Sequence, residues 1–299
     1  MFVRLERYIR GRADWRRLRN ANCVVVSFGK SGRTWLRVLL SRYYQLKCRL
    51  PPHAMLIYDN LHRLNPAVPI IHFTHDNYIR DYTGNSSKVD FYGKRLVLLT
   101  RDPRDIAVSQ YFQWKHRMKA RKKIINQYPL DENISIHDFA RSESAGLPKI
   151  IRFMNGWASE IHRIPNHHIL RYEDLRADTA AALGELLRFL GETPSNDQIV
   201  DCVQYGSVDN MRRLELTKAG QQMGGTRLQP GDPSNPDSFK VRRAQVGGYA
   251  DYFTPAETAA LDDLVNGELS PVFGYKSRFS QRVNSVKNSE PTALEGTPP

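Results

Sequence analysis

The most constraining feature of this sequence is a short glycine loop set between a strand and a helix. Residues 23–28, CVVVSF, form an apolar run that predicts a buried β-strand. GKSGRT follows at 29–34, and apolar residues then recur at helical spacing in WLRVLLSRYYQ. In such a loop several backbone N–H groups can point at one anion, while the helix N-terminus and the lysine add positive charge. The unit therefore predicts a phosphate-binding α/β protein.

Later apolar runs extend this unit into a fold. Continuous apolar runs are typical of parallel strands covered on both faces, and they predict strands at 68–73, 95–100 and 167–172. Helices are predicted at 148–161, at 179–191 and at 255–265, with a C-cap at Gly191 for the second and an N-cap at Thr254 for the third. A further helix is predicted to begin at Pro103, after an N-cap at Asp102, and to run past Trp114 into the basic run 115–123. The alternation predicts an α/β fold: a doubly wound, mostly parallel sheet flanked by helices, with a P-loop-like anion-binding loop.

We expect one domain over residues 1–278 and a disordered tail over 279–299. The tail ends in NSEPTALEGTPP and lacks apolar periodicity, so it has no face to bury. Residues 220–240 are rich in Gly, Pro, Asn, Asp and Gln and are predicted to form a long loop.

The charge balance narrows the class of partner. The net charge is +13, which favours anionic partners: nucleotides, nucleic acid, anionic lipid or acidic sugars. A generally basic protein without such a partner remains an equal alternative. The three cysteines show no metal-ligand spacing, and we read them as reduced thiols of a cytoplasmic protein.

The N-terminal segment is also basic, with seven arginines among the first 20 residues. Phe2, Leu5 and Ile9 would share one face of a helix, which would allow contact with a membrane surface. Packing of this helix on the domain is the more ordinary interpretation. No apolar run in the sequence is long enough to span a bilayer.

The nucleoside-triphosphate P-loop, G-x-x-x-x-G-K-[ST], is one possible reading of the loop. Gly29, Lys30 and Ser31 supply its end, but Val24 stands where its first glycine belongs. The strand at 95–100 is followed by an arginine and not by a carboxylate that would hold Mg²⁺. A P-loop nucleotide kinase therefore remains an alternative, as does a tight turn that binds nothing.

Four segments together resemble the cytosolic-type sulfotransferases. SFGKSGRTWL (27–36) is similar to the family's 5′-phosphosulfate loop, and RDPRDIAVSQYFQ (101–113) is similar to its 3′-phosphate motif. RYEDL (171–175) and VRRAQVGGYADYFT (241–254) resemble two later motifs, and all four lie in the family's order. The resemblance covers most of the chain, and the first two segments together are its most specific part.

The resemblance implies a sulfotransferase enzyme that uses 3′-phosphoadenosine 5′-phosphosulfate (PAPS) and no metal. It would move the sulfuryl group to an acceptor hydroxyl. The implied donor-binding residues are Lys30, Ser31, Gly32, Arg33, Thr34, Trp35, Arg101, Ser109, Tyr172, Arg242 and Arg243. Lys30 would also stabilise the leaving phosphate, as lysines do in phosphoryl transfer.

A histidine is the natural general base at neutral pH, and two lie close together. His72 falls inside the strand predicted at 68–73, whereas His75 follows its end. Open α/β sheets bind ligands at the carboxyl ends of strands, which favours His75. His75 also matches the position of the family's catalytic histidine.

Two departures from the family pattern bear on this site. Arg33 stands where the family usually has threonine, and Phe73 stands where it often has a lysine. The acceptor is expected to be a hydroxyl of a small molecule, carbohydrate or lipid, and the oligomeric state stays open. No nucleic-acid-binding motif is evident, so a basic nucleotide- or nucleic-acid-binding protein without catalysis is the remaining alternative.

Overall fold

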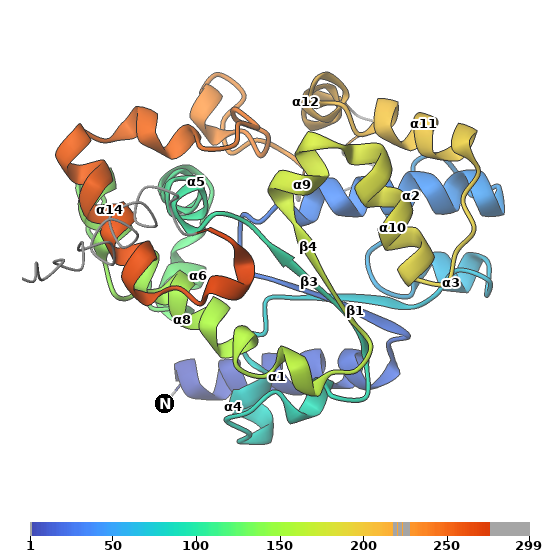
Figure 1. The fold of residues 1–299 in the computed structure, drawn as a ribbon, viewed down its shortest axis with the longest axis horizontal. Coiled ribbons are helices and arrows are strands. Elements are labelled where there is room, and N and C mark those ends of the chain that lie inside the picture. Colours follow the sequence, from blue (N-terminus) through green and yellow to red (C-terminus); the bar gives the residue numbers. More distant parts are fainter. Residues whose placement is uncertain (1, 218–219, 221–222, 224–227, 276–299) are drawn as a thin grey trace, which may run out of the picture.

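The computed structural model describes residues 2–275, except 218–219, 221–222 and 224–227. Its centre is one sheet of four parallel strands in the order β2-β1-β3-β4 (Figure 1). The strands are β1 (Cys23–Ser27), β2 (Ile71–Thr74), β3 (Arg95–Thr100) and β4 (His167–Arg171). The tail predicted at 279–299 lies outside the described residues, and the domain bounds 1–278 stay a prediction.

Helices cover both faces of the sheet, because alternate strand residues point to opposite sides and both sets are apolar. Val24 and Val26 belong to one core, whereas Val25 belongs to the other. The first core packs against α1 (Phe2–Asn20), α5 (Pro103–His116), α8 (Leu147–Ala158) and α14 (Pro255–Glu268). The second core packs against α2 (Arg33–Cys48), α9 (Tyr172–Ala177), α10 (Thr179–Phe189) and α11 (Asn196–Tyr205). The predicted doubly wound parallel sheet is confirmed.

The shorter elements surround these layers. They are α3 (Asn60–Leu64), α4 (Ile79–Thr83), α6 (Ala120–Ile125), α7 (Ile136–Arg141) and α12 (Val208–Leu216), with 3₁₀ turns at Val89–Phe91, Ile161–Arg163, Pro236–Ser238, Gly248–Tyr252 and Pro271–Phe273. The predicted N-caps are confirmed, since Asp102 accepts the N–H of Arg104 and Thr254 that of Glu257. Gly191 closes α10 with a φ of 90°.

The prediction that one helix runs from Pro103 into 115–123 is wrong. α5 ends at His116, and α6 begins separately at Ala120. Arg117, at the break, donates to the Ser238 carbonyl (2.7 Å) and lies 3.9 Å from the buried Glu215. This cation therefore turns inward, because burying Glu215 without a positive partner would be costly.

The N-terminal helix α1 packs on the domain through its second half. Leu18 is fully buried, and α1 lies beside α4 at one end of the sheet (Figure 1). Phe2, Leu5 and Ile9 are exposed on the first half. Across the described residues, no helix has the length and apolar character that a membrane crossing needs.

Candidate active site

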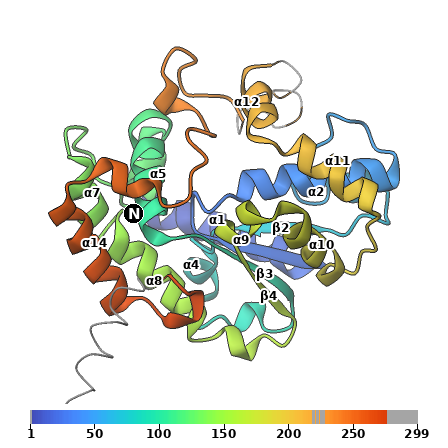
Figure 2. The same ribbon diagram turned by 45° about the horizontal axis from the view of Figure 1, so that its top comes forward.

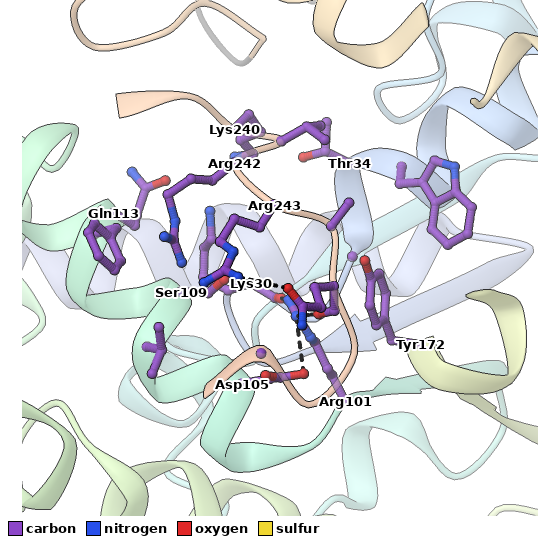
Figure 3. Close-up of a pocket in the computed structure, with 18 of the residues that line it drawn as sticks. Lys30, Thr34, Arg101, Asp105, Ser109, Gln113, Tyr172, Lys240, Arg242 and Arg243 are labelled. Carbon is purple, nitrogen blue, oxygen red and sulfur yellow. Dashed lines mark hydrogen bonds and ion pairs between the residues drawn. The ribbon is translucent and has the colours of Figure 1, made fainter. Parts of the chain in front are cut away.

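A pocket lies at the carboxyl ends of the strands, where open parallel sheets bind ligands (Figure 3). Each strand end contributes to its lining. Lys30 follows β1, His75 follows β2, Arg101 follows β3, and Tyr172 follows β4. The parallel order of the sheet thus brings together four residues that are far apart in the sequence.

The loop after β1 depends on left-handed backbone. Lys30 has a φ of 72° and Gly32 a φ of 90°. A Cβ on Gly32 would lie 2.6 Å from the Tyr172 ring, so both conformation and space require glycine there. Thr34 lines the pocket. Ser31 does not: its side chain is buried, and its hydroxyl has no hydrogen-bond partner among the described residues.

Lys30 sits among other cations. Burial, together with the nearby Arg117 and Arg101, lowers the pKa of Lys30 to about 7, against a smaller opposing effect of Glu215. An anion bound beside Lys30 would restore its positive charge, because an opposite charge favours the protonated form. The positive charges around Lys30 would therefore favour binding of a phosphate group.

Arg101 is held at the end of β3 with part of its guanidinium uncommitted. Its Nη atoms donate to the carbonyls of Lys30 (3.3 Å) and Gln245 (3.1 Å), and its Nε has no hydrogen-bond partner among the described residues. The guanidinium lies over the Tyr172 ring, 4.4 Å from its centroid. Ser109 lines the same pocket from α5 (Figure 3).

A segment of residues 240–249, which we call the strap, closes one side of the pocket. Glu215 of α12 accepts the backbone N–H groups of Lys240 (2.6 Å) and Val241 (2.7 Å). Asp105 of α5 accepts those of Gly247 (2.9 Å) and Tyr249 (3.0 Å). Two buried carboxylates thus hold the two ends of the strap.

The strap carries Arg242 and Arg243 to the lining of the pocket (Figure 3), and the charge of Arg242 acts on Lys30. Arg242 stacks on the Phe112 ring, 3.8 Å from its centroid, and contacts the Tyr252 hydroxyl. Arg243 pairs with Asp251 at 2.6 Å. The structure therefore brings the predicted strap cations and the loop after β1 to the same pocket.

Trp35 lines the pocket beside Tyr172. Its indole N–H donates to the Gly206 carbonyl at 2.7 Å, and its ring meets the Tyr172 ring edge-on, with 5.8 Å between centroids. The guanidinium of Arg176 lies 5.5 Å from the Trp35 ring. These contacts fix the orientation of an aromatic surface next to the cations.

His75 is oriented by a hydrogen bond at each ring nitrogen. Its Nδ1 lies 2.7 Å from the Ser27 carbonyl oxygen, which can only accept, so Nδ1 carries the proton and Nε2 the lone pair. An Nη of Arg33 lies 2.5 Å from that Nε2. Burial and the Arg33 charge hold the pKa of His75 well below its ordinary value, so the ring is neutral at neutral pH.

His72 lies elsewhere. It is buried in β2 outside the pocket lining, with its Nε2 2.9 Å from the Asp14 carboxylate of α1. The sequence places His75 beyond the end of its strand and His72 within it, and the structure shows the same arrangement.

Sequence reasoning missed several residues of the site. Lys240 lines the pocket directly before the segment recognised at 241–254, and Asp105 lies within the segment at 101–113, where only the cation and the hydroxyl were considered. Glu215 and Arg117 gave no local signal, because they act through contacts between distant segments. Among the described residues, no group of three or more His, Cys, Asp or Glu side chains could hold a metal ion.

The parallel sheet, the left-handed glycine loop and the cationic pocket at the carboxyl edge define an α/β protein that binds a phosphorylated ligand. The family model described as "Sulfotransferase domain" matches residues 21–273. The chain therefore belongs to the sulfotransferase family and is an enzyme of the PAPS-dependent class. This match argues against the two alternatives from the sequence, a P-loop kinase and a non-catalytic binding protein.

Two curated relatives are named as sulfotransferases, and one solved structure shares the fold. Cytosolic sulfotransferase 5 of Arabidopsis thaliana is 24% identical over 84% of this chain and 80% of its own length. A glycolipid sulfotransferase of Mycobacterium bovis is 25% identical over 87% of this chain and 88% of its own. The crystal structure of mouse sulfotransferase SULT7A1 complexed with PAP, adenosine 3′,5′-bisphosphate, has a TM-score of 0.58 at 17% identity, over 89% of each chain.

Proposed function

We propose that this enzyme transfers the sulfuryl group of PAPS to an acceptor hydroxyl, with His75 as general base and Lys30 stabilising the leaving phosphate. The observation that carries the proposal is the placement of both residues in one pocket: a neutral histidine whose Nε2 lone pair faces Arg33, and a lysine in the phosphate-binding loop.

Two groups of residues would bind the two ends of the donor. The loop at 30–34 would hold the 5′-phosphosulfate, with Trp35 and Tyr172 beside the adenine. Arg101, Ser109, Arg242 and Arg243 would hold the 3′-phosphate. Arg101 supports this division, because its Nε has no hydrogen-bond partner among the described residues and could donate to a phosphate oxygen. Ser31 would contribute through its backbone, since its side chain is buried outside the pocket lining.

The reaction balances with these residues alone. The acceptor oxygen forms a bond to sulfur as the bond from sulfur to the bridging phosphate oxygen breaks, and that oxygen keeps the electron pair. The acceptor proton passes to His75 Nε2. Lys30 places positive charge where the leaving oxygen becomes negative, which lowers the barrier more than it strengthens ground-state binding.

The acceptor, the absence of a metal and the location complete the proposal. The acceptor is a small-molecule, carbohydrate or lipid hydroxyl, which the names of the relatives support, among them a glycolipid sulfotransferase. No metal takes part, because Lys30 and the arginines supply the charge that a metal would otherwise supply. A cytoplasmic location is supported by relatives named as cytosolic sulfotransferases.

Lys30→Ala and Arg101→Ala should separate catalysis from donor binding. Lys30→Ala should lower kcat by about 100-fold, since a charge placed at a developing anion contributes about 3 kcal/mol. Arg101→Ala should instead raise the Kd for PAP, because the 3′-phosphate lies away from the reacting sulfur. Transfer of labelled sulfate from PAPS and calorimetric titration with PAP measure the two effects. If both variants lost only affinity and kept kcat, Lys30 would not have the assigned role.

A further inference from the structure

The contact between Arg33 and His75 is an obstacle to the proposed reaction. A general base must offer its lone pair to the acceptor hydroxyl, and here an Arg33 Nη lies 2.5 Å from His75 Nε2. The Nδ1 side is committed to the Ser27 carbonyl, so Nε2 is the one ring atom that can take the proton. Arg33 must therefore leave this position before the acceptor can react.

The surroundings of His75 are cationic on several sides. Arg33 at the start of α2, Lys122 of α6 and Lys240 of the strap each lower the pKa of His75, so all three charges lie within electrostatic reach of the ring. Arg33 and Lys122 also repel one another, since Arg33 contributes to a lowered pKa of Lys122. An anion near His75 would relieve this repulsion.

The pocket is lined by more basic than acidic side chains. Among the described residues, its lining includes seven basic side chains: Lys30, Arg33, Arg101, Arg176, Lys240, Arg242 and Arg243. PAPS carries roughly four negative charges, about two of them on the 3′-phosphate. In the part of the chain that the structure describes, Asp105 is the one carboxylate of the lining, and its oxygens are engaged by two strap N–H groups and by Arg101 at 3.4 Å. The lining around His75 is therefore basic and would favour a further anion beside the donor.

We propose that Arg33 recognises the acceptor: a carboxylate, phosphate or sulfate group on the acceptor draws the guanidinium away from His75, which exposes the base only to acceptors that are themselves anionic. A guanidinium binds such groups with two parallel hydrogen bonds, whereas it makes a single one to the imidazole nitrogen. Its departure also removes a positive charge from the ring, which strengthens His75 as a base.

This inference rests on the proposed function, and it names the class of acceptor. It assigns to Arg33 a role on the acceptor side, in place of the donor-binding role implied by the resemblance. It also gives a role to Lys240, which sequence reasoning missed: an anionic acceptor nearby would favour the protonated form of its amine, whose pKa is lowered by burial and by neighbouring cations.

The first test concerns His75 in the PAP-bound protein. Arg33→Met removes the charge while keeping an unbranched side chain, and Arg176→Met removes a charge from the Trp35 side of the same pocket. We expect the pKa of His75, measured by NMR of the ring, to rise in Arg33→Met and to stay at the wild-type value in Arg176→Met. An unchanged pKa in Arg33→Met would overturn the contact on which the inference depends.

The second test uses product charge, which does not require the acceptor to be known. The enzyme transfers labelled sulfate from PAPS to a metabolite extract, and the products are separated by anion exchange. A neutral acceptor yields a product with one negative charge, whereas an anionic acceptor yields one with two or more. We expect wild-type products to be mainly multiply charged, at least tenfold over singly charged ones, and Arg33→Met to lose this preference.

The outcomes distinguish this inference from the function beneath it. If no labelled product forms with the wild-type enzyme, the proposed function fails. If products form but are mainly singly charged, or if Arg33→Met lowers all products equally, then transfer stands and the acceptor role of Arg33 is wrong. Arg176→Met should keep the wild-type ratio of product charges, and a shifted ratio there would attribute the preference to overall pocket charge and not to Arg33.

Discussion

His75 and His72 are three residues apart, yet the structure gives them different surroundings. His75 faces the pocket with its lone pair on Nε2, whereas His72 is buried against Asp14 on the α1 side of the sheet. The two histidines differ because β2 ends at Thr74, so that His72 lies within the strand and His75 lies beyond it.

Substitution of these two histidines should therefore have unequal effects. His75→Ala should lower kcat by at least ~100-fold, the lower range for loss of a general base, while the Kd for PAP stays nearly constant. His72→Ala should retain most activity per folded molecule, with a lower Tm because removal of the buried ring leaves a cavity. Steady-state kinetics, PAP titration and thermal unfolding of both variants measure these effects. Equal losses of kcat would argue against the assignment of His75.

At the scale of elements, the strap depends on two carboxylates that belong to different helices. Glu215 lies on α12 and Asp105 on α5, and each accepts two backbone N–H groups of the strap. Burial raises the pKa of both carboxyl groups, against the nearby arginines Arg117 and Arg101 and the strap N–H groups, which lower it. These hydrogen bonds set the position of Arg242 and Arg243.

Asp105→Ala should weaken PAP binding, because it removes the anchor of the strap and also the carboxylate that lies 3.4 Å from Arg101. Hydrogen bonds to a charged acceptor contribute about 1.5–3 kcal/mol, so loss of this anchor should raise the Kd for PAP about tenfold or more. Asp251→Ala is the matched control: it removes a carboxylate that pairs with Arg243 outside the anchors, and the Kd should stay constant or fall. Calorimetric titration compares the two, and far-UV circular dichroism checks that each variant folds. A Kd in Asp105→Ala equal to that of the wild type would contradict the anchoring role.

The sequence predicts this fold better than it predicts the site. Continuous apolar runs give the strands, and Asp102, Gly191 and Thr254 mark helix ends, because these signals are local. The break after α5 was missed since its cause is not local: Arg117 turns toward Glu215, about a hundred positions along the chain. Helical propensity alone carries no information about such a partner.

The site shows the same division between local motifs and distant contacts. Gly32 and Arg101 follow from motifs, and the structure places both at the pocket. The anchoring of the strap and the contact of Arg33 with His75 arise from side chains that only the folded chain brings together. The burial of Ser31 likewise follows from packing and not from its motif.

For the whole molecule, the pocket joins parts that pack on opposite sides of the sheet. α5 and α14 lie on one side, α2 and α11 on the other, and the chain that contains the strap passes between α5 and α12 (Figure 2). A ligand held from both sides should stabilise the whole chain. PAP at 100 times its Kd should add about 2.7 kcal/mol to the free energy of unfolding. Thermal unfolding should show a rise in Tm that survives EDTA, whereas ATP with Mg²⁺ should give a smaller one. A rise that required a divalent metal would contradict the metal-free proposal.

The stabilisation by PAP should also depend on pH with a definite sign. The pKa of Lys30 is lowered to about 7 in the free protein, and bound phosphates should raise it. Below pH 7 Lys30 is already protonated, so binding takes up no proton there. Above pH 7 binding must protonate it, and the affinity should fall by up to tenfold per pH unit until the pKa of the complex is reached. Lys240, whose pKa burial also lowers, adds to this slope. Titration from pH 7 to 9 avoids the phosphate pKa near ~6. Lys30→Arg stays charged and should give a shallower slope than the wild type, whereas parallel curves would show that Lys30 does not titrate with binding.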